Sequence, residues 1–229
     1  MMNSRVPLKP TMVPTANILQ RTFLVKDKSI GTAFTIDRDG RQYLVTARHV
    51  SEGSSGGIDL FHDGQWKRLS VAVVGVGKSG EDVAVLRPDT QLAHKALTLE
   101  IGNRGYALGQ QVMFFGFPFG WQYGDCGGAN HGYPLPFVKA GIVSQLTSPG
   151  GARRLFVDAH GNKGFSGGPL VAEIAGNMSA IGVVVIAVPN PPDVETIDEH
   201  AGFVAVEPIH VVTEIVDDNP VGFQLNHSS

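Results

Sequence analysis

The residue best suited to covalent chemistry in this chain is Ser166, which lies between glycines in the segment Gly-Phe-Ser-Gly-Gly-Pro-Leu at 164–170. A serine hydroxyl is a weak nucleophile until a base accepts its proton and a third group orients that base. Two upstream segments offer such groups: His49 ends an apolar run at 44–50, and Asp82 opens another at 82–87. The order His49, Asp82, Ser166 therefore provides the set of groups that acyl transfer from a peptide requires.

The same turn could also bind the negative charge that develops during acyl transfer. We expect the backbone N–H groups of Gly164 and Ser166 to form the oxyanion hole, because glycine can adopt the dihedral angles that turn its peptide inward. Each residue also has a simpler interpretation, since a serine between glycines is often only a turn and Asp82 could pair with Arg87. The hypothesis depends on the three residues together.

The elements that must position these residues are predicted to be short strands. The 29 glycines and 14 prolines follow no Gly-X-Y repeat, which indicates many tight turns and an all-β barrel or sandwich. Asp39-Gly40 and Asp63-Gly64 are hairpin signals. Residues 1–20 are expected to form an irregular arm, residues 21–229 a single domain, and residues 208–217 a short helix.

Composition excludes several functions. The net charge of −3 and the 17% of charged residues give no basic face for nucleic acid. The single cysteine, Cys126, cannot form an internal disulfide, and no Cys/His cluster has zinc-site spacing, so neither a metal nor another cofactor is expected. Without an apolar leader or a membrane-length apolar run, we expect a cytoplasmic protein with no membrane partner.

Six short segments in order make the chain similar to the trypsin-like (chymotrypsin-fold) serine proteases, and most of all to the HtrA/Deg-type protease domain. They lie at 44–50, 82–87, 115–120, 140–144, 158–159 and 164–170. The resemblance covers about residues 22–216, and we expect none of the PDZ domains usual in that group. It implies two antiparallel six-stranded β-barrels, at about 21–95 and 105–216, with a short C-terminal helix. It also implies a serine endopeptidase that acts on polypeptides, and it allows a homo-oligomer.

The resemblance further suggests which residues line the substrate pocket. They are His160, Val185, Ile186, Ala187 and Gly202. His160 stands six positions before Ser166, where specificity for lysine or arginine would need an acidic residue. Because the other walls are apolar, we expect a small or medium apolar side chain before the cleaved bond.

One departure from the family pattern concerns activation. In many trypsin-type enzymes a newly formed N-terminus pairs with an aspartate directly before the serine, but Phe165 occupies that position here. We therefore expect no activation of that kind. Any control is expected to act through the loops at 117–136, 160–164 and 189–201.

Two alternatives remain open. The segment 164–168 also fits the Gly-x-Ser-x-Gly pattern of α/β-hydrolases, with Asp193 or Asp198 and His210 as nominal partners. That fold needs alternating strands and helices, which the sequence does not predict. The second alternative is a protease-like binding module in which the triad is idle.

Overall fold

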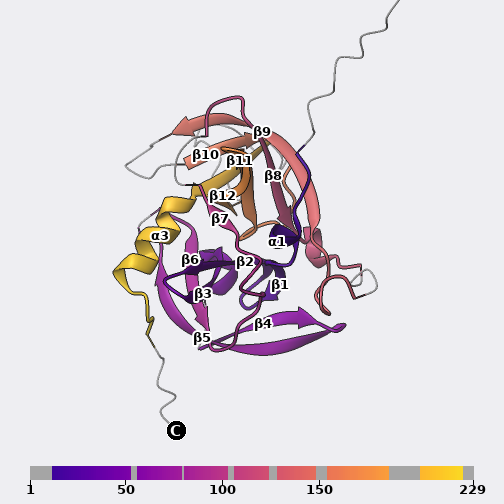
Figure 1. Cartoon of the computed structure of the whole chain (residues 1–229), viewed down its shortest axis with the longest axis vertical. Helices are drawn as coiled ribbons and strands as arrows, with labels where there is room; N and C mark the ends of the chain where they lie inside the picture. The colour runs from indigo at the N-terminus through magenta and orange to yellow at the C-terminus, as the bar shows by residue number, and fades with distance from the viewer. Residues whose placement is uncertain are drawn as a thin grey trace, which may run out of the picture.

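The computed structural model describes residues 12–52, 56–78, 80–102, 106–123, 128–147, 154–185 and 202–223. Its first half forms a closed antiparallel barrel in the order β1-β2-β3-β6-β5-β4, the lower unit in Figure 1. The strands are β1 (Thr22–Lys26), β2 (Ile30–Arg38), β3 (Arg41–Ala47), β4 (Gly57–His62), β5 (Gln65–Val76) and β6 (Val83–Pro88).

The second half forms another closed antiparallel barrel, in the order β11-β8-β9-β10-β13-β12, which the pairing of β11 with β12 completes. Its strands are β8 (Gln111–Gly116), β9 (Phe137–Thr147), β10 (Arg154–Asp158), β11 (Pro169–Ile174), β12 (Asn177–Val185) and β13 (Phe203–Pro208). The short strand β7 (Glu100–Ile101) adds to β12 in parallel. The expected architecture of two six-stranded barrels is confirmed.

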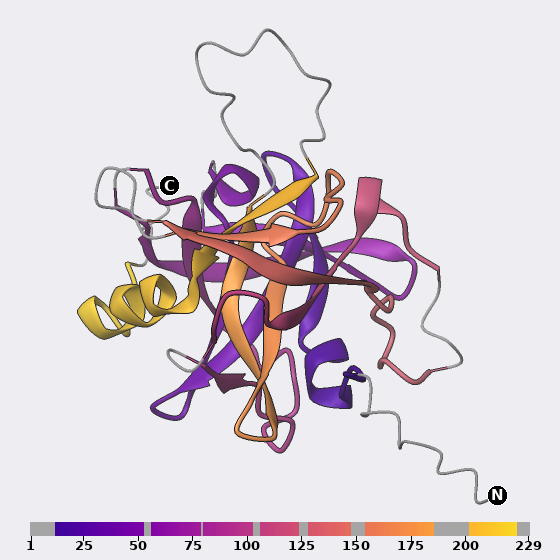
Figure 2. The same ribbon diagram turned by 90° about the horizontal axis from the view of Figure 1, so that it is seen from above.

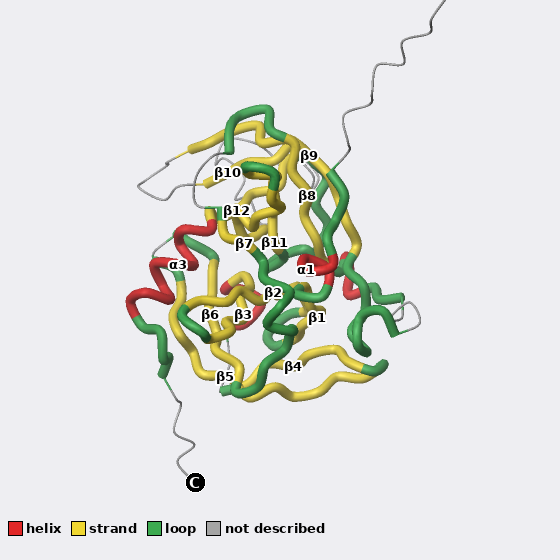
Figure 3. Tube along the Cα trace, viewed as in Figure 1, coloured by secondary structure: helices red, strands yellow, loops and turns green. Residues whose placement is uncertain are grey.

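Helices are few in the described part of the chain (Figure 3). They are α1 (Ala16–Leu19), α2 (Arg48–Ser51), the 3₁₀ turn η1 (Pro118–Gly120) and α3 (Ile209–Asp218). The helix α3 confirms the one expected near the C-terminus, whereas α1 lies inside the segment expected to be irregular. None of these helices is long and apolar enough to cross a membrane.

The two Asp-Gly pairs form the hairpin turns that the sequence predicts. Asp39 and Gly40 have φ of 49° and 74°, and Asp63 and Gly64 have φ of 50° and 76°. Two successive residues with positive φ define the type I′ turn, whose twist matches that of paired strands. These turns fix the registers of β2 with β3 and of β4 with β5.

The strand β3 is apolar without alternation because both of its faces are buried. Tyr43 and Val45 point into a core shared with the second barrel, while Leu44 and Ala47 belong to the core of the first barrel. Helix α3 packs on β5 and β6 of the first barrel and on β12 and β13 of the second, at the side of the molecule (Figure 2).

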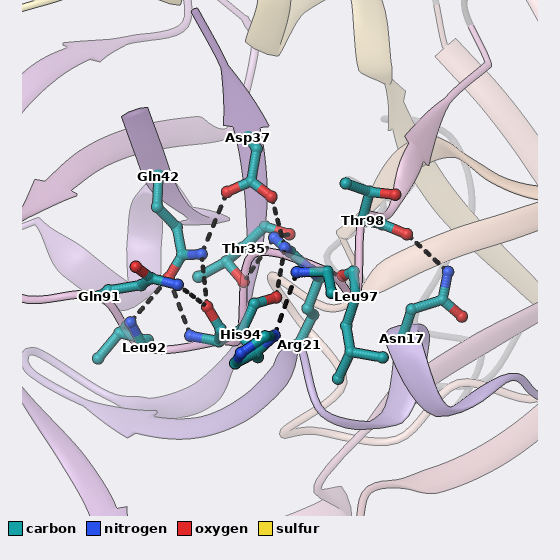
Figure 4. A network of polar contacts seen from close by, with 12 residues as sticks. Asn17, Arg21, Thr35, Asp37, Gln42, Gln91, Leu92, His94, Leu97 and Thr98 are labelled. Carbon is teal, nitrogen blue, oxygen red and sulfur yellow. Dashed lines mark hydrogen bonds and ion pairs between the residues drawn. The ribbon is translucent and has the colours of Figure 1, made fainter. Parts of the chain in front are cut away.

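A buried charge network attaches the segment between the barrels to the first barrel (Figure 4). The Arg21 side chain is fully buried and pairs with Asp37, and its guanidinium also donates to Leu97 O and His94 O. Gln42 Oε1 accepts the Leu92 N–H at 2.8 Å. The segment 92–97 is thereby held to β2 and β3 of the first barrel.

Candidate active site

His49 and Asp82 meet because of the register of two strands. In the pairing of β3 with β6, Ala47 lies opposite Val83, so the residues just beyond these strand ends are neighbours. Asp82 Oδ2 lies 2.5 Å from His49 Nδ1, and Asp82 Oδ1 accepts the His49 backbone N–H at 2.9 Å. With Nδ1–H donating to the carboxylate, the neutral imidazole presents Nε2 as an acceptor.

The turn that carries Ser166 packs against the segment that carries His49. Ser166 O accepts the Thr32 N–H at 2.8 Å. A Cβ on Gly167, whose φ is +87°, would overlap Thr32 O and Thr46 Oγ1 and lie 2.8 Å from Ala47 N. Glycine at 167 is therefore required for the serine turn of the second barrel to reach the end of β3 in the first.

The described part of the chain leaves two N–H groups of the turn without an acceptor, those of Gly164 and Ser166. The neighbouring N–H groups do have acceptors: the Phe165 N–H donates to Asn162 O at 3.3 Å, and the Gly167 N–H donates to Val184 O at 2.8 Å. These are the two donors that the sequence predicts for the oxyanion hole. Two unpaired backbone donors in the turn that carries the serine can hold an oxyanion.

The peptide before Gly164 has a fixed orientation. Lys163 O accepts the Phe119 N–H at 2.7 Å. In a trans peptide the N–H points opposite to the carbonyl, so the Gly164 N–H is directed away from η1. In the next peptide, Gly164 O accepts a hydrogen bond from the Thr32 hydroxyl at 2.6 Å. The oxygen of that hydroxyl accepts a second hydrogen bond, from the Phe117 N–H at 3.2 Å.

The proposed substrate pocket is described in part. Ala159 N–H donates to Gly202 O at 3.1 Å, so the segment leading to His160 lies beside Gly202. Val185 is buried at the end of β12. Ile186 and Ala187 lie outside the described residues, and the structure says nothing of these two walls.

Several residues near the site gave no signal in the sequence. Lys139 of β9 donates to His160 O, and Thr32 of β2 links Gly164 to Phe117. Glu207 is fully buried, and its Oε1 lies 3.4 Å from the Asp82 backbone N–H. Each acts through contacts between residues far apart in the chain, so a local pattern could not reveal them.

Glu207 has an unusual environment for a carboxyl group. Burial raises the pKa of Glu207, while the neighbouring Arg154 guanidinium opposes that rise. Arg154 Nε donates to Glu207 Oε1 at 3.0 Å, and Arg154 also donates to Gly80 O at 2.6 Å. Glu207 Oε2 has no hydrogen-bond partner among the described residues.

No group of three or more His, Cys, Asp or Glu side chains within the described ranges could hold a metal ion.

Comparisons with known proteins agree with this fold. The sequence profile of the trypsin-like peptidase domain matches residues 31–182. A search of curated proteins gave no significant match.

Solved structures share the fold. The HtrA-type protease AlgW with a tripeptide has a TM-score of 0.60 at 23% identity, over 90% of this chain and 63% of that one. The serine endoprotease from Yersinia pestis has a TM-score of 0.61 at 21% identity, over 90% of this chain and 67% of that one. The inactive form of the Rv3671c protease from M. tuberculosis has a TM-score of 0.61 at 18% identity, over 89% and 91%. This chain thus spans 63% of the length of AlgW.

Proposed function

Since the chain belongs to the trypsin-like peptidase family, we propose that it is a serine endopeptidase whose triad is Ser166, His49 and Asp82. The main observation behind this proposal is that the backbone N–H groups of Gly164 and Ser166 have no hydrogen-bond acceptor in the described part of the chain. An idle relative could keep the three side chains, but catalysis also needs donors aimed at the developing oxyanion.

In the proposed reaction, Ser166 Oγ attacks the carbonyl carbon of the peptide bond and His49 Nε2 takes the hydroxyl proton. The Asp82 carboxylate stabilises the resulting imidazolium without accepting its proton. The N–H groups of Gly164 and Ser166 bind the oxyanion. His49 then protonates the leaving amine, and water hydrolyses the acyl-enzyme by the same steps.

We further propose that the side chain before the cleaved bond is small or medium and apolar. Two features support this preference: Val185, the proposed wall, is apolar and buried, and His160 provides no carboxylate that could bind lysine or arginine. Cleavage-site profiling of a denatured proteome tests this preference. Cuts mainly after lysine or arginine would contradict it.

The nucleophile is tested by Ser166→Ala. We expect turnover to fall by about 10⁶-fold, the loss known for nucleophile removal in another serine protease, because no hydroxyl remains to attack. A fluorophosphonate probe should label the wild-type protein and not the variant.

The matched control is Ser144→Ala, which removes a hydroxyl that donates to Phe156 O within the second barrel. This variant should keep labelling and turnover. If the wild-type protein is not labelled although it binds peptides, the idle binding module is the better description.

The α/β-hydrolase alternative does not fit the fold. It requires a mainly parallel sheet with intervening helices and a serine that precedes a helix. Here Ser166 precedes the antiparallel strand β11, and the described parallel pairing is limited to β7 with β12.

A further inference from the structure

One side chain of β9 ties together the loop that carries the proposed oxyanion donors, residues 160–166, which we call the oxyanion loop. Lys139 Nζ donates to His160 O at 2.5 Å and to Asn162 Oδ1 at 2.7 Å. The same ammonium lies over the ring of Phe165, 5.4 Å from its centroid. Three positions of the loop therefore converge on a single cation.

These contacts flank the part of the loop that most needs support. Gly164 has φ of +100° and no side chain to restrict its rotation, so rotation of its peptide is opposed only by the surroundings. Asn162, which Lys139 holds by its side chain, accepts the Phe165 N–H through its backbone carbonyl. Lys139 thus contacts the loop on both sides of Gly164.

Phe165 is itself fixed in the core. It is fully buried and makes an edge-on contact with Phe114, with ring centroids 5.1 Å apart. Phe114 lies opposite Lys139 in the pairing of β8 with β9. A cation is attracted to the face of an aromatic ring. The Phe165 ring can therefore interact with the Lys139 ammonium, although Phe165 has no carboxylate with which to form an ion pair.

We propose that Lys139 is a positioning residue that holds the oxyanion loop so that the Gly164 N–H faces the developing oxyanion. It would serve the purpose that a buried N-terminal ion pair serves in other trypsin-type enzymes. The inference rests on the proposed function. It explains how the loop is held so that the N–H groups of Gly164 and Ser166 stay available to the oxyanion.

Other described contacts also anchor the loop, but they act at different positions from Lys139. The Phe119 N–H holds Lys163 O, and Thr32 Oγ1 holds Gly164 O. Both act on the peptides next to Gly164, whereas Lys139 fixes His160 and Asn162, where the loop begins. Burial lowers the pKa of Lys139, which agrees with an ammonium partly withdrawn from water into this cluster.

The test compares Lys139→Met, Lys139→Arg and wild type with a peptide substrate and with the fluorophosphonate probe. We expect Lys139→Met to lower kcat by roughly 10-fold to 100-fold, the effect of lost hydrogen bonds to a charged group. KM should change little, because the loop supports the transition state more than the bound substrate. Lys139→Arg should recover part of kcat, since it keeps the charge and the donors.

Lys78→Met is the matched control, because the Lys78 side chain is 80% exposed and pairs with Glu214 of α3 and not with the oxyanion loop. It should leave kcat unchanged. Substrate affinity measured in Ser166→Ala protein, with and without Lys139→Met, should also be equal.

The outcomes separate the two proposals. A wild-type protein that the probe does not label contradicts the proposed function itself. A wild-type protein that is labelled, together with Lys139→Met labelled at the same rate and with the same kcat, overturns the positioning role alone. If Lys139→Met does not fold, Asn162→Ala removes one acceptor and leaves β9 intact. An unchanged kcat in that variant then overturns the proposal.

Discussion

Both oxygens of the Asp82 carboxylate accept hydrogen bonds from His49, the residue that the carboxylate orients. One oxygen accepts the ring Nδ1–H of His49 and the other accepts the backbone N–H of the same residue. The His49 side chain is 40% exposed and that of Asp82 is 22% exposed, so the ring can reach substrate while its orienting group is shielded. Because both oxygens act as acceptors, an amide cannot replace the carboxylate at this position.

Asp82→Asn should therefore lower kcat strongly with little change in stability. The amide has one acceptor oxygen, so the ring must either lose its partner or shift to the tautomer whose Nε2 carries hydrogen and cannot accept the serine proton. We expect a loss of about 10⁴-fold, as known for the same change in another serine protease. Steady-state kinetics measure it.

The control for that substitution is Asp59→Asn, which removes a carboxylate paired with Arg68 in the first barrel. Its kcat should match that of wild type. Full activity of Asp82→Asn would mean that another group orients His49.

At the scale of elements, the second barrel supports the Asp82 segment through a buried ion pair. Arg154 at the start of β10 and Glu207 in β13 bind each other, and they also contact Gly80 O and the Asp82 N–H in the first barrel. A buried pair of this kind is costly to break from one side, because the remaining charge has no partner.

We expect Arg154→Met to reduce the free energy of unfolding by about 3 kcal/mol near pH 7.5 and by less near pH 4.5. Burial already raises the pKa of Glu207, and loss of the guanidinium raises it further. Above pH 4.3, which is about the ordinary pKa of a glutamate side chain, the unfolded chain releases the Glu207 proton while the folded protein still holds it. The free energy of unfolding consequently falls as pH rises through this window.

Urea unfolding at the two pH values measures this effect. Arg38→Met is the control, since it breaks the more exposed pair with Asp217 and should cost about 1 kcal/mol or less. Equal losses for Arg154→Met at both pH values would contradict the role assigned to Glu207.

At the scale of the whole molecule, the two barrels share a core. One cluster of buried residues joins Tyr43 and Val85 of the first barrel with Phe115 and Val183 of the second, and Val212 of α3 packs on it. Neither barrel can unfold without exposing the apolar surface of the other. Since the proposed active site needs residues from both barrels, this shared core also preserves its geometry.

The shared core predicts a single cooperative unfolding transition. The two tryptophans report on different halves: Trp66 lies in β5 and contacts Phe61, and Trp121 follows η1 and contacts Phe119. Urea midpoints should coincide for Trp66→Phe and Trp121→Phe proteins when each is followed by its remaining tryptophan, and they should match the midpoint from circular dichroism. Separated transitions within either variant would show that the barrels unfold independently.

Features that depend on neighbours in the chain were predictable. The Asp-Gly pairs predicted their hairpins. The expected helix at 208–217 is shifted by one residue at each end relative to α3, Ile209–Asp218. By contrast, α1 and β7 are too short to leave a pattern, and they form through contacts such as the Asn17 Nδ2 donation to Thr98 O at 2.6 Å.

The sequence by itself determined the residue types at the proposed site, because His49, Asp82 and Ser166 each lie in a local motif beside a strand. Only the tertiary structure decided that the N–H groups of Gly164 and Ser166 have no acceptor in the described chain, and which side chains contact the loop that carries them. Arg21, Lys139 and Glu207 are charged residues within strand-like or flanking segments, and nothing local shows that they are buried or half-buried. Their partners lie up to 125 residues away, so only folding of the two barrels brings each charge to its hydrogen-bond partners.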